Sequence, residues 1–353
     1  MQTQSKFRLL VVRLGSMGDI LHALPAVTAL RQAHPGWIID WVVEPRWRPL
    51  LAAEDSAARG PAQPLVDHLH SAPTRQWKKA PLSLNTLNEI KALRSSLQAG
   101  GYDAVLDLQG AIRSAVVARM AGCRRLIGED NPRERPARWL FTERVVTRGA
   151  HVIEQDVELA SAVAGDDLTP ATPPLPLDPA AEAWAGQFLA PFDNQATVLI
   201  NPGAGWGAKR WPIDRYATVA QGLIGRGLRV LVNAGPGEEP LAQAIVQSAP
   251  AATPLTCSLE QLIALTRRVA LVIAGDTGPL HLACALVRPV VGIYGPTDPS
   301  RNGPFGTAFR VLRSPDSRRD HSRHSAPEAG LLTIQPEDVL RAAAELLAPE
   351  NAP

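Results

Sequence analysis

Short apolar segments alternate with amphipathic segments of helix length along the whole chain. The apolar segments are rich in Val, Ile and Leu, as expected of strands that are buried on both faces of a parallel sheet. In the first half they cover residues 9–14, 37–43, 66–70, 104–108 and 126–128. In the second half they cover residues 197–201, 229–233, 253–256, 271–274 and 290–294. This alternation predicts an α/β protein in which βαβ crossovers join parallel strands.

The pattern restarts after a proline-rich stretch, which we interpret as a domain boundary. Five prolines fall within residues 166–179, DDLTPATPPLPLDP, a composition that favours an extended, semi-rigid connector. The sequence therefore predicts an N-terminal domain over residues 1–165, a linker over 166–179 and a C-terminal domain over 180–353. Residues 313–330 are polar and rich in breakers, so we expect a surface loop there and a final helix that begins near Pro336.

Composition narrows the class of protein. Hydrophobic residues make up 45% and charged residues 20% of the 353 residues, and no apolar run reaches the roughly 18 residues of a transmembrane helix. The first residues run directly into a strand pattern without the features of a secretory signal, so we expect a cytoplasmic protein. The cysteines Cys123, Cys257 and Cys284 form no CxxC pair, which argues against a disulfide framework or a zinc ribbon and favours small buried residues.

The net charge of +2 hides an asymmetry between the halves. Residues 1–165 carry 21 Lys and Arg against 16 Asp and Glu, a net +5, whereas residues 166–353 carry 15 against 18, a net −3. This difference fits an N-terminal site for an anionic ligand better than a nucleic-acid binder. Arg75, Lys78 and Lys79 flank Trp77, and seven arginines lie within residues 124–148. Such clusters suit phosphate or carboxylate, although a solvated helix face is the commoner explanation for any single cation.

A glycine-rich turn follows the first predicted strand. In GSMGDILHALPAV, residues 15–27, two glycines let backbone amides approach a ligand, and the helix N-terminus behind them favours negative charge. Asp19 then lies at the carboxyl edge of the sheet, where α/β sites form. Alternatively, Ser16 and Asp19 form a capping box and have no other role. The spacing departs from the dinucleotide fingerprint G-x-G-x-x-G, which argues against an NAD site.

Three further strand exits in the second half carry candidate anion-binding residues. In NPGAGWGAKRWP, residues 201–212, Lys209 and Arg210 follow a glycine-rich turn and could neutralise a diphosphate, or they could simply be solvated. In AGDTGPLHLACA, residues 274–285, Asp276 or Thr277 caps a helix whose first amides suit phosphate, although a purely structural cap fits as well. Glu238 follows a Gly-Pro-Gly turn, where a carboxylate can accept hydrogen bonds from ribose.

Six segments, in this order, resemble the ADP-heptose:lipopolysaccharide heptosyltransferases, most closely the heptosyltransferase I group. They are GSMGDILHALPAV, DWVVEPRW, YDAVLDLQG, NPGAGWGAKRWP, AGDTGPLHLACAL and GIYGPTDP, between about residue 8 and residue 305. The resemblance implies a GT-B fold, with two facing Rossmann-like domains and a crevice between them. It also implies an inverting glycosyltransferase without a required metal, which moves L-glycero-D-manno-heptose from ADP-heptose to Kdo on a lipid A precursor.

The resemblance also implies roles for single residues. Asp19 matches the general base, and Lys209 matches the cation that meets the donor diphosphate. The remaining donor-site matches are Gly203, Glu238 at the ribose, Cys257 near adenine, the pyrophosphate turn of Asp276, Thr277 and Gly278, and His281, which is equally expected as a packed core histidine. The acceptor-site matches are Ser16, Gly18, Arg75, Lys78, Lys79 and one of Arg133 and Arg135. Gln76 stands where the family often has another cation, and the spacing around Pro136 leaves Arg133 and Arg135 as alternatives.

The expected partners are therefore a nucleotide sugar and a Kdo-lipid A type of acceptor, with weak peripheral association at the inner face of the inner membrane and no nucleic acid. Two other classes stay open at this point. A sugar-nucleotide epimerase of the same fold would need a second acid/base residue at the donor ring, which the sequence does not single out. A non-catalytic nucleotide-sugar binder would bind the donor without turnover.

Overall fold

The chain divides into two compact units, Met1–Leu177 and Asp178–Pro353. The computed structural model describes residues 6–53, 58–192, 194–318 and 325–348. The boundary falls inside the stretch predicted as the linker. Part of that stretch packs on the first unit, because Leu175 is buried and the backbone N–H groups of Ala171 and Leu177 donate to the carbonyls of Pro25 and Pro61.

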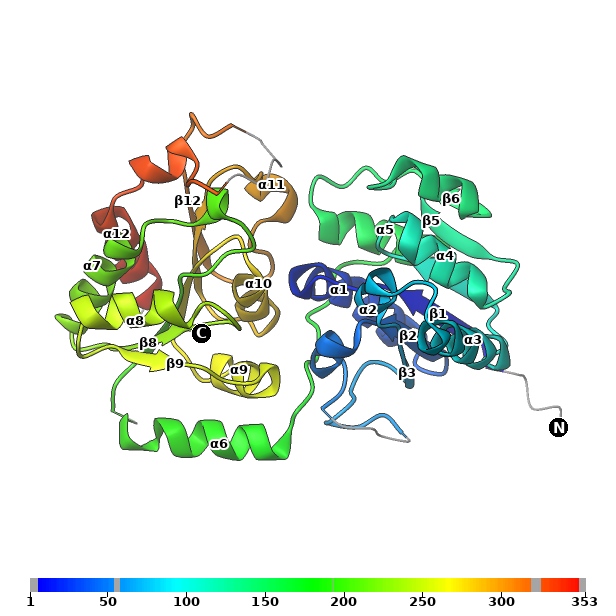
Figure 1. Cartoon of the computed structure of the whole chain (residues 1–353), viewed down its shortest axis with the longest axis horizontal. Helices are drawn as coiled ribbons and strands as arrows, with labels where there is room; N and C mark the ends of the chain where they lie inside the picture. The colour runs from blue at the N-terminus through cyan, green and yellow to red at the C-terminus, as the bar shows by residue number, and fades with distance from the viewer. Residues whose placement is uncertain (1–5, 54–57, 193, 319–324, 349–353) are drawn as a thin grey trace. The chain divides into compact units, whose positions relative to one another are not determined.

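The first unit (Figure 1) is built on a six-stranded sheet in the order β3-β2-β1-β4-β5-β6, and every strand pair is parallel. The strands are β1 Arg8–Val12, β2 Ile38–Val43, β3 His68–Ser71, β4 Ala104–Asp107, β5 Leu126–Glu129 and β6 Glu143–Val145. The helices are α1 Met17–Ala33, α2 Thr74–Lys79, α3 Leu84–Ala99, α4 Ile112–Met120 and α5 Val152–Ala164, with 3-10 turns η1 Pro45–Leu50 and η2 Arg135–Leu140. This is the strand order of a doubly wound Rossmann sheet.

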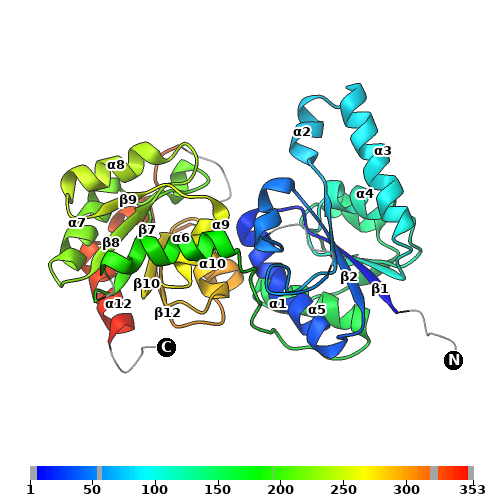
Figure 2. The same ribbon diagram turned by 90° about the horizontal axis from the view of Figure 1, so that it is seen from below.

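Helices cover both faces of this sheet. Figure 2 shows α1 and α5 on one side of β1 and β2, with α3 and α4 on the other. On the α3 and α4 side, Leu10, Val12 and Val105 from the strands pack with Leu93 and Leu97 of α3 in one core cluster. Because both faces are covered, the central strands read as continuous apolar runs, which is why the sequence predicted them.

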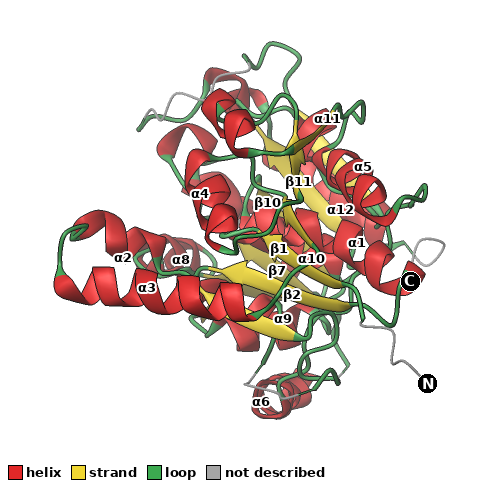
Figure 3. Cartoon of the chain, turned by 90° about the vertical axis from the view of Figure 1, so that its right-hand side faces the viewer, coloured by secondary structure: helices red, strands yellow, loops and turns green. Residues whose placement is uncertain are grey.

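The second unit repeats the same topology in the order β12-β11-β10-β7-β8-β9, again with all pairs parallel. Its strands are β7 Thr197–Asn201, β8 Arg229–Asn233, β9 Thr253–Leu255, β10 Leu271–Gly275, β11 Val290–Tyr294 and β12 Phe309–Arg313. Its helices are α6 Pro179–Leu189, α7 Ile213–Ile224, α8 Glu239–Ser248, α9 Leu259–Thr266, α10 Gly278–Ala285, α11 Pro299–Asn302 and α12 Pro336–Leu347, with 3-10 turns η3 Ala190–Phe192, η4 Gly207–Lys209 and η5 Ala329–Thr333. Figure 3 distinguishes the helices, in red, from the strands, in yellow.

All ten predicted strands are present within two residues of their predicted ends, but two strands were missed. β6 and β12 are edge strands, and their sequences, ERV and FRVLR, are charged and largely exposed or half-buried. An edge strand with polar side chains lacks the apolar run that marks a buried strand. The final helix begins at Pro336 as expected.

The prediction of a surface loop over residues 313–330 is wrong at both ends. Arg313 closes β12, and Ser314, Ser317 and Gly330 are buried. Residues 319–324 of this stretch lie outside the described part of the chain. No helix among the described residues combines the length and the hydrophobicity that crossing a bilayer requires.

Candidate active site

The glycine-rich turns gather at the topological switch point of each sheet. In the first unit the strand order reverses between β1 and β4, and in the second between β7 and β10. Ligands of open α/β sheets bind outside the carboxyl ends of strands at such points. The turn that holds Asp19 follows β1, and the turns that hold Lys209 and Asp276 follow β7 and β10. Each unit therefore carries predicted site residues where its topology favours a ligand.

Asp19 lies in the first turn of α1, and its carboxylate is bound from two sides. The backbone N–H and the hydroxyl of Ser16 both donate to Oδ2, at 2.8 and 3.1 Å. Nη2 of Arg13 lies 3.4 Å from Oδ1. The contact between Ser16 and Asp19 that the capping-box alternative predicts is thus present. It does not exclude a chemical role, because 27% of the Asp19 side chain stays exposed.

The environment of Asp19 holds it ionised. Burial raises the pKa of this carboxyl, but the Arg13 guanidinium, the two bonds from Ser16 and the more distant charge of Arg133 outweigh burial and lower the pKa below its usual value. The Arg13 side chain is only 7% exposed, so it acts on Asp19 with little screening. Arg133 is exposed, and its effect on Asp19 favours it over Arg135 as the arginine nearer this edge.

The adjacent strand β4 ends in another carboxylate, Asp107, which is buried. Its Oδ1 accepts 2.8 Å bonds from the backbone N–H groups of Gln109 and Gly110, which closes the turn after the strand. The Gln109 side chain accepts a bond from Leu14 N–H at 2.8 Å and so ties this turn to the end of β1. Burial raises the pKa of Asp107 to about 6 against those bonds and the nearby Arg13. Gly110 has φ +62°, and a Cβ there would lie 3.1 Å from the backbone nitrogen of Arg133.

A cluster of arginines adjoins α2. Arg75, Lys78 and Lys79 are exposed, whereas Trp77 between them is buried in the core. Burial lowers the pKa of Arg46, and the charges of Arg75 and Arg113 lower it further. Like charges gathered in this way are stabilised by an anion. The sequence singled out Arg75 but missed Arg46 and Arg113, which come from η1 and α4.

In the second unit, Lys209, Asp276 and His281 form one buried polar group. The Lys209 ammonium pairs with Oδ2 of Asp276, and His281 Nε2 lies 3.2 Å from Oδ1. The Lys209 Nζ also lies 4.3 Å from the centre of the Trp206 ring. Burial raises the pKa of Asp276, but the bond to His281 and the ammonium of Lys209 reverse this and hold the pKa well below its usual range. Asp276 therefore anchors Lys209 at the end of β10.

The residues predicted at the ribose and at adenine each have a contact in the second unit. Gly203 and Glu238 are in contact, since a Cβ on Gly203 would lie 2.0 Å from a carboxylate oxygen of Glu238. Cys257 Sγ lies 3.8 Å from Oδ1 of Asn233, whose side chain donates to Asn201 at 2.7 Å. Burial raises the pKa of Cys257 to about 12, so its thiol stays protonated. We expected all three cysteines to be buried. Cys284 is buried, but Cys123 and Cys257 are only half-buried.

Thr277 and Gly278 occupy the start of α10. Thr277 is the N-cap residue in extended conformation, and its hydroxyl donates to the Gly275 carbonyl at 3.2 Å instead of capping the helix. The side chain of Asp276 is engaged by Lys209 and His281, and so it does not cap the helix either. His281 is buried, in agreement with its expected place in the core, and bonds to the same carboxylate.

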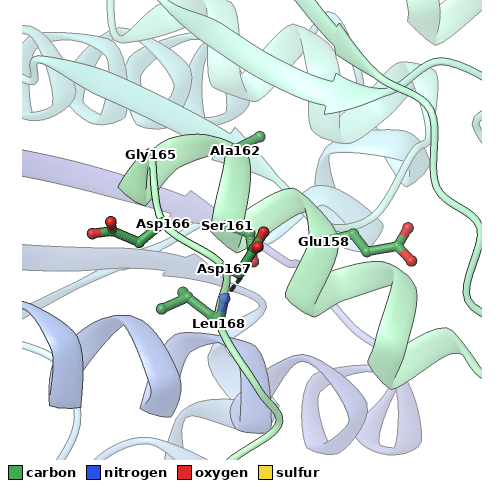
Figure 4. Close-up of a pocket in the computed structure, with 7 residues that line it drawn as sticks. All are labelled: Glu158, Ser161, Ala162, Gly165, Asp166, Asp167 and Leu168. Carbon is green, nitrogen blue, oxygen red and sulfur yellow. Dashed lines mark hydrogen bonds between the residues drawn. The ribbon is translucent and has the colours of Figure 1, made fainter.

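A hollow beside α5 lies away from the turn of Asp19 (Figure 4). It is lined by Glu158, Ser161, Ala162 and residues 165–168. Asp166 on its rim is 4.0 Å from His34, which caps the far end of α1 from Asp19. The 17-residue helix α1 separates His34 from Asp19 by roughly 20 Å. The hollow carries three acidic residues, so it does not suit an anionic substrate.

Among residues 6–53, 58–192, 194–318 and 325–348, no group of three or more His, Cys, Asp or Glu side chains could hold a metal ion. Fixed positive charge in the described site comes instead from Arg13, Lys209 and the arginine cluster. The sequence analysis did not single out Arg13 as a site residue. Its position at a strand end, two residues before Gly15, could have indicated it.

The model of glycosyltransferase family 9 (heptosyltransferase) matches residues 90–330. Lipopolysaccharide heptosyltransferase 1 of Escherichia coli K12 is 33% identical over 317 residues, which cover 87% of this chain and 94% of that protein. The chain belongs to glycosyltransferase family 9. The family confirms the expected enzyme class, a glycosyltransferase, and sets aside the epimerase and the non-catalytic binder.

Further heptosyltransferases to which the chain is similar agree with this assignment. Lipopolysaccharide heptosyltransferase 1 of Salmonella typhimurium is 32% identical, with 88% of this chain and 95% of that protein covered. Among solved structures, E. coli heptosyltransferase WaaC with ADP-2-deoxy-2-fluoro heptose is 28% identical and has a TM-score of 0.76, with 96% of this chain and 99% of that chain covered. The predicted GT-B class, with two Rossmann-like units in one chain, is confirmed.

Proposed function

We propose that this family 9 enzyme moves L-glycero-D-manno-heptose from ADP-heptose to Kdo of a lipid A precursor, in the synthesis of the lipopolysaccharide core. The observation that carries the proposal is that each unit has one such residue at its own switch point, an ionised, partly exposed Asp19 in the first and a buried Lys209 in the second. The 33% identity to a lipopolysaccharide heptosyltransferase 1 and the likeness to a structure with an ADP-heptose analogue support the sugar and the nucleotide.

In the proposed reaction an acceptor hydroxyl attacks the anomeric carbon of the heptose while Asp19 takes up the hydroxyl proton. The bond from that carbon to the diphosphate oxygen breaks, and ADP leaves with the electron pair. A carboxylate that is ionised at neutral pH and open on one side is suited to this step. Attack from the side opposite to the leaving group inverts the anomeric centre.

Lys209 and the start of α10 are suited to the leaving diphosphate. An ammonium that is fixed by Asp276 meets developing negative charge without having to reorganise, and helix N-terminal amides such as those of Thr277 and Gly278 add to the positive field. Glu238 beside Gly203 is proposed to bind the ribose, and the backbone near Cys257 to meet adenine. His281 is proposed to act on the donor site through its contact with Asp276.

The first unit is suited to an anionic acceptor. Ser16 and Gly18 line the turn of Asp19, and Arg75, Lys78, Lys79 and Arg133 supply charge for the phosphates and carboxylates of a Kdo-lipid A type of molecule. Such an acceptor is embedded in a membrane, so we place the enzyme in the cytoplasm with a peripheral attachment to the inner face of the inner membrane.

The test is a transfer assay in which ADP release and product mass are measured with ADP-heptose and a Kdo-containing lipid A precursor. We expect turnover that depends on both substrates and gives an inverted anomeric centre. Transfer from another nucleotide sugar with a higher kcat/KM, or no transfer above hydrolysis without acceptor, would contradict the proposal. Parallel reactions with UDP-glucose and GDP-mannose provide the donor controls.

A further inference from the structure

The loop and helix ends that join α2 to α3 expose apolar side chains. The exposed fractions are 87% for Leu82, 80% for Leu84 and 48% for Leu87. Single exposed leucines are common on proteins, but three within six residues at the tip of a projecting hairpin are not explained by packing. Figures 2 and 3 both show α2 and α3 extending away from the sheet of the first unit. We call residues 80–87 the hairpin tip.

The hairpin below the tip is held firmly. Trp77 is buried in the core of the unit and donates through Nε1 to Glu89 at 2.7 Å, and Asn85 donates to the other oxygen of Glu89 at 2.8 Å. The backbone N–H of Arg75 donates to Glu44 at 3.1 Å, which ties α2 to the turn after β2. These hydrogen bonds fix the hairpin, so the leucines at its tip are exposed in an ordered structure.

The charges beside the tip have one sign. Residues 75–88 contain no Asp or Glu and three cations, Arg75, Lys78 and Lys79, all of them exposed. On α3, Leu84, Leu87, Lys91 and Arg94 follow one another at helical spacing and are all exposed, whereas Leu93 and Leu97 are buried. The acidic residue that follows this stretch, Glu89, is bound by Trp77 and Asn85.

The spacing of these groups matches a lipid surface. Lys91 lies about 10 Å along the helix from Leu84, which is close to the depth to which apolar faces enter the boundary between headgroups and acyl chains. Lysine and arginine placed at that height meet anionic headgroups, while the leucines ahead of them leave water. An acidic protein partner would pair with the cations but would leave the leucines unexplained.

We propose that the hairpin tip docks this enzyme onto a bilayer with anionic headgroups, with Leu82 and Leu84 inserted and with Lys78, Lys79, Lys91 and Arg94 at headgroup level. The proposal rests on the lipid-linked acceptor of the proposed function and adds the surface that reaches it. Membrane binding by this tip needs no donor and no turnover, so the two proposals can fail separately.

The test is co-sedimentation of the full chain with vesicles of phosphatidylcholine alone or mixed with phosphatidylglycerol. We expect the Leu82→Ser/Leu84→Ser variant to bind the mixed vesicles at least about tenfold more weakly than the unaltered enzyme, because two leucines no longer gain from leaving water. The Phe309→Ser/Leu332→Ser variant removes two half-exposed apolar side chains from the second unit and is the matched control. Its binding should not change.

Charge is tested by Lys91→Gln/Arg94→Gln, which should weaken binding to the mixed vesicles roughly fivefold per cation at low salt and not affect phosphatidylcholine vesicles. Turnover of Leu82→Ser/Leu84→Ser on a water-soluble acceptor without acyl chains should match that of the unaltered enzyme, with an unchanged melting temperature. The proposal is wrong if the leucine variant sediments like the unaltered enzyme, if the control loses as much, or if turnover on the soluble acceptor falls equally. It is also wrong if the tip instead mediates a dimer, seen in analytical ultracentrifugation and lost in the leucine variant.

Discussion

The two units share one topology but surround their switch-point aspartates differently. Asp19 keeps more than a quarter of its side chain exposed, and the contacts that hold it ionised come from Arg13 and Ser16. Asp276 is 9% exposed, and its two oxygens are engaged by Lys209 and His281. Both carboxylates have contacts at both oxygens, so the difference lies in exposure: a carboxylate that solvent can reach can accept a proton from a substrate, whereas one that is closed off can only position its partners. The carboxyl edges of two sheets with one topology thus support two kinds of chemistry, and the exposure of the aspartate distinguishes them.

The largest effect that we expect, and the one that most strongly tests the contrast between Asp19 and Asp276, is that of replacing Lys209. We expect Lys209→Met to lower kcat roughly 100- to 1000-fold, because a preorganised charge on the leaving group is lost. It also leaves Asp276 buried without its cation, which should cost about 3 kcal/mol or more of stability. Steady-state kinetics and thermal melting of one preparation measure both, and Arg210→Met, which removes the exposed cation next to it, is the control.

A double variant separates the two roles of Lys209. Lys209→Met/Asp276→Asn removes the unpaired carboxylate and should recover much of the melting temperature without recovering turnover. If turnover returns as well, Lys209 serves only its ion pair, and the contrast between the two aspartates no longer assigns it to the donor.

A smaller effect sharpens the account of the first unit. The folded-state pKa of Asp107, about 6, lies above its ordinary value of 3.8, so the folded state binds this proton more tightly than the unfolded state. Ionisation of Asp107 therefore costs stability, about 3 kcal/mol at most, and this cost is complete above pH 6 and absent below about pH 4. We expect Asp107→Asn to remove this loss of stability with rising pH. Urea unfolding of both proteins at several pH values between those limits measures it.

Asp214→Asn, at an exposed aspartate on α7, is the control for Asp107→Asn and should leave the pH dependence as it is. An Asp107→Asn profile parallel to that of the unaltered protein would mean that Asp107 stays ionised through this range. The first unit would then hold two carboxylates, Asp19 and Asp107, that are ionised in this range. The contrast between Asp19 in the first unit and Asp276 in the second would weaken.

The smallest expected effect is that of a chelator. Positive charge in the proposed reaction comes from Lys209 and helix-terminal amides, so we expect activity to be unchanged in excess EDTA. Loss of activity with EDTA and its return with magnesium or manganese would show that the second unit relies on a metal ion. Mass spectrometry of the purified enzyme under native conditions gives an independent check.

Much of the fold could be predicted because the central strands are buried on both faces and so read as apolar runs. β6 and β12 could not be predicted in this way, since edge strands such as Glu143–Val145 expose polar side chains. The loop over residues 313–330 was misjudged for a related reason. Ser314 and Ser317 are polar but buried, with Ser317 donating to Glu328 at 2.9 Å, and composition alone does not reveal such pairs.

The turns of the site were visible because glycines and caps at strand exits are local features. The electrostatic partners were not, because they depend on contacts between distant segments. Gln109 bonds to Leu14 across 95 residues of sequence, and Arg46 shares its surroundings with Arg75 and Arg113 from two other elements. His281 was placed in the core by its sequence, but its contact with Asp276 required the structure.

The central claim is that Asp19 is the base and that its contact with Ser16 is only part of its role. Because its pKa lies below the usual value, unaltered turnover should show no acid limb from this residue above about pH 4. Asn in its place can still accept the Ser16 N–H bond but cannot take up a proton, and it faces Arg13 with a neutral amide. Some loss of stability, up to about 3 kcal/mol, is therefore expected as well.

The most direct test measures kcat, the Kd for ADP and the melting temperature of Asp19→Asn on one preparation, at a temperature where the variant is folded. The account predicts that kcat falls roughly 100-fold or more, in the range for loss of a positioned base, while the Kd for ADP changes less than about twofold. A folded variant with near-normal kcat would contradict it and would leave Asp19 as a helix cap, with the base elsewhere.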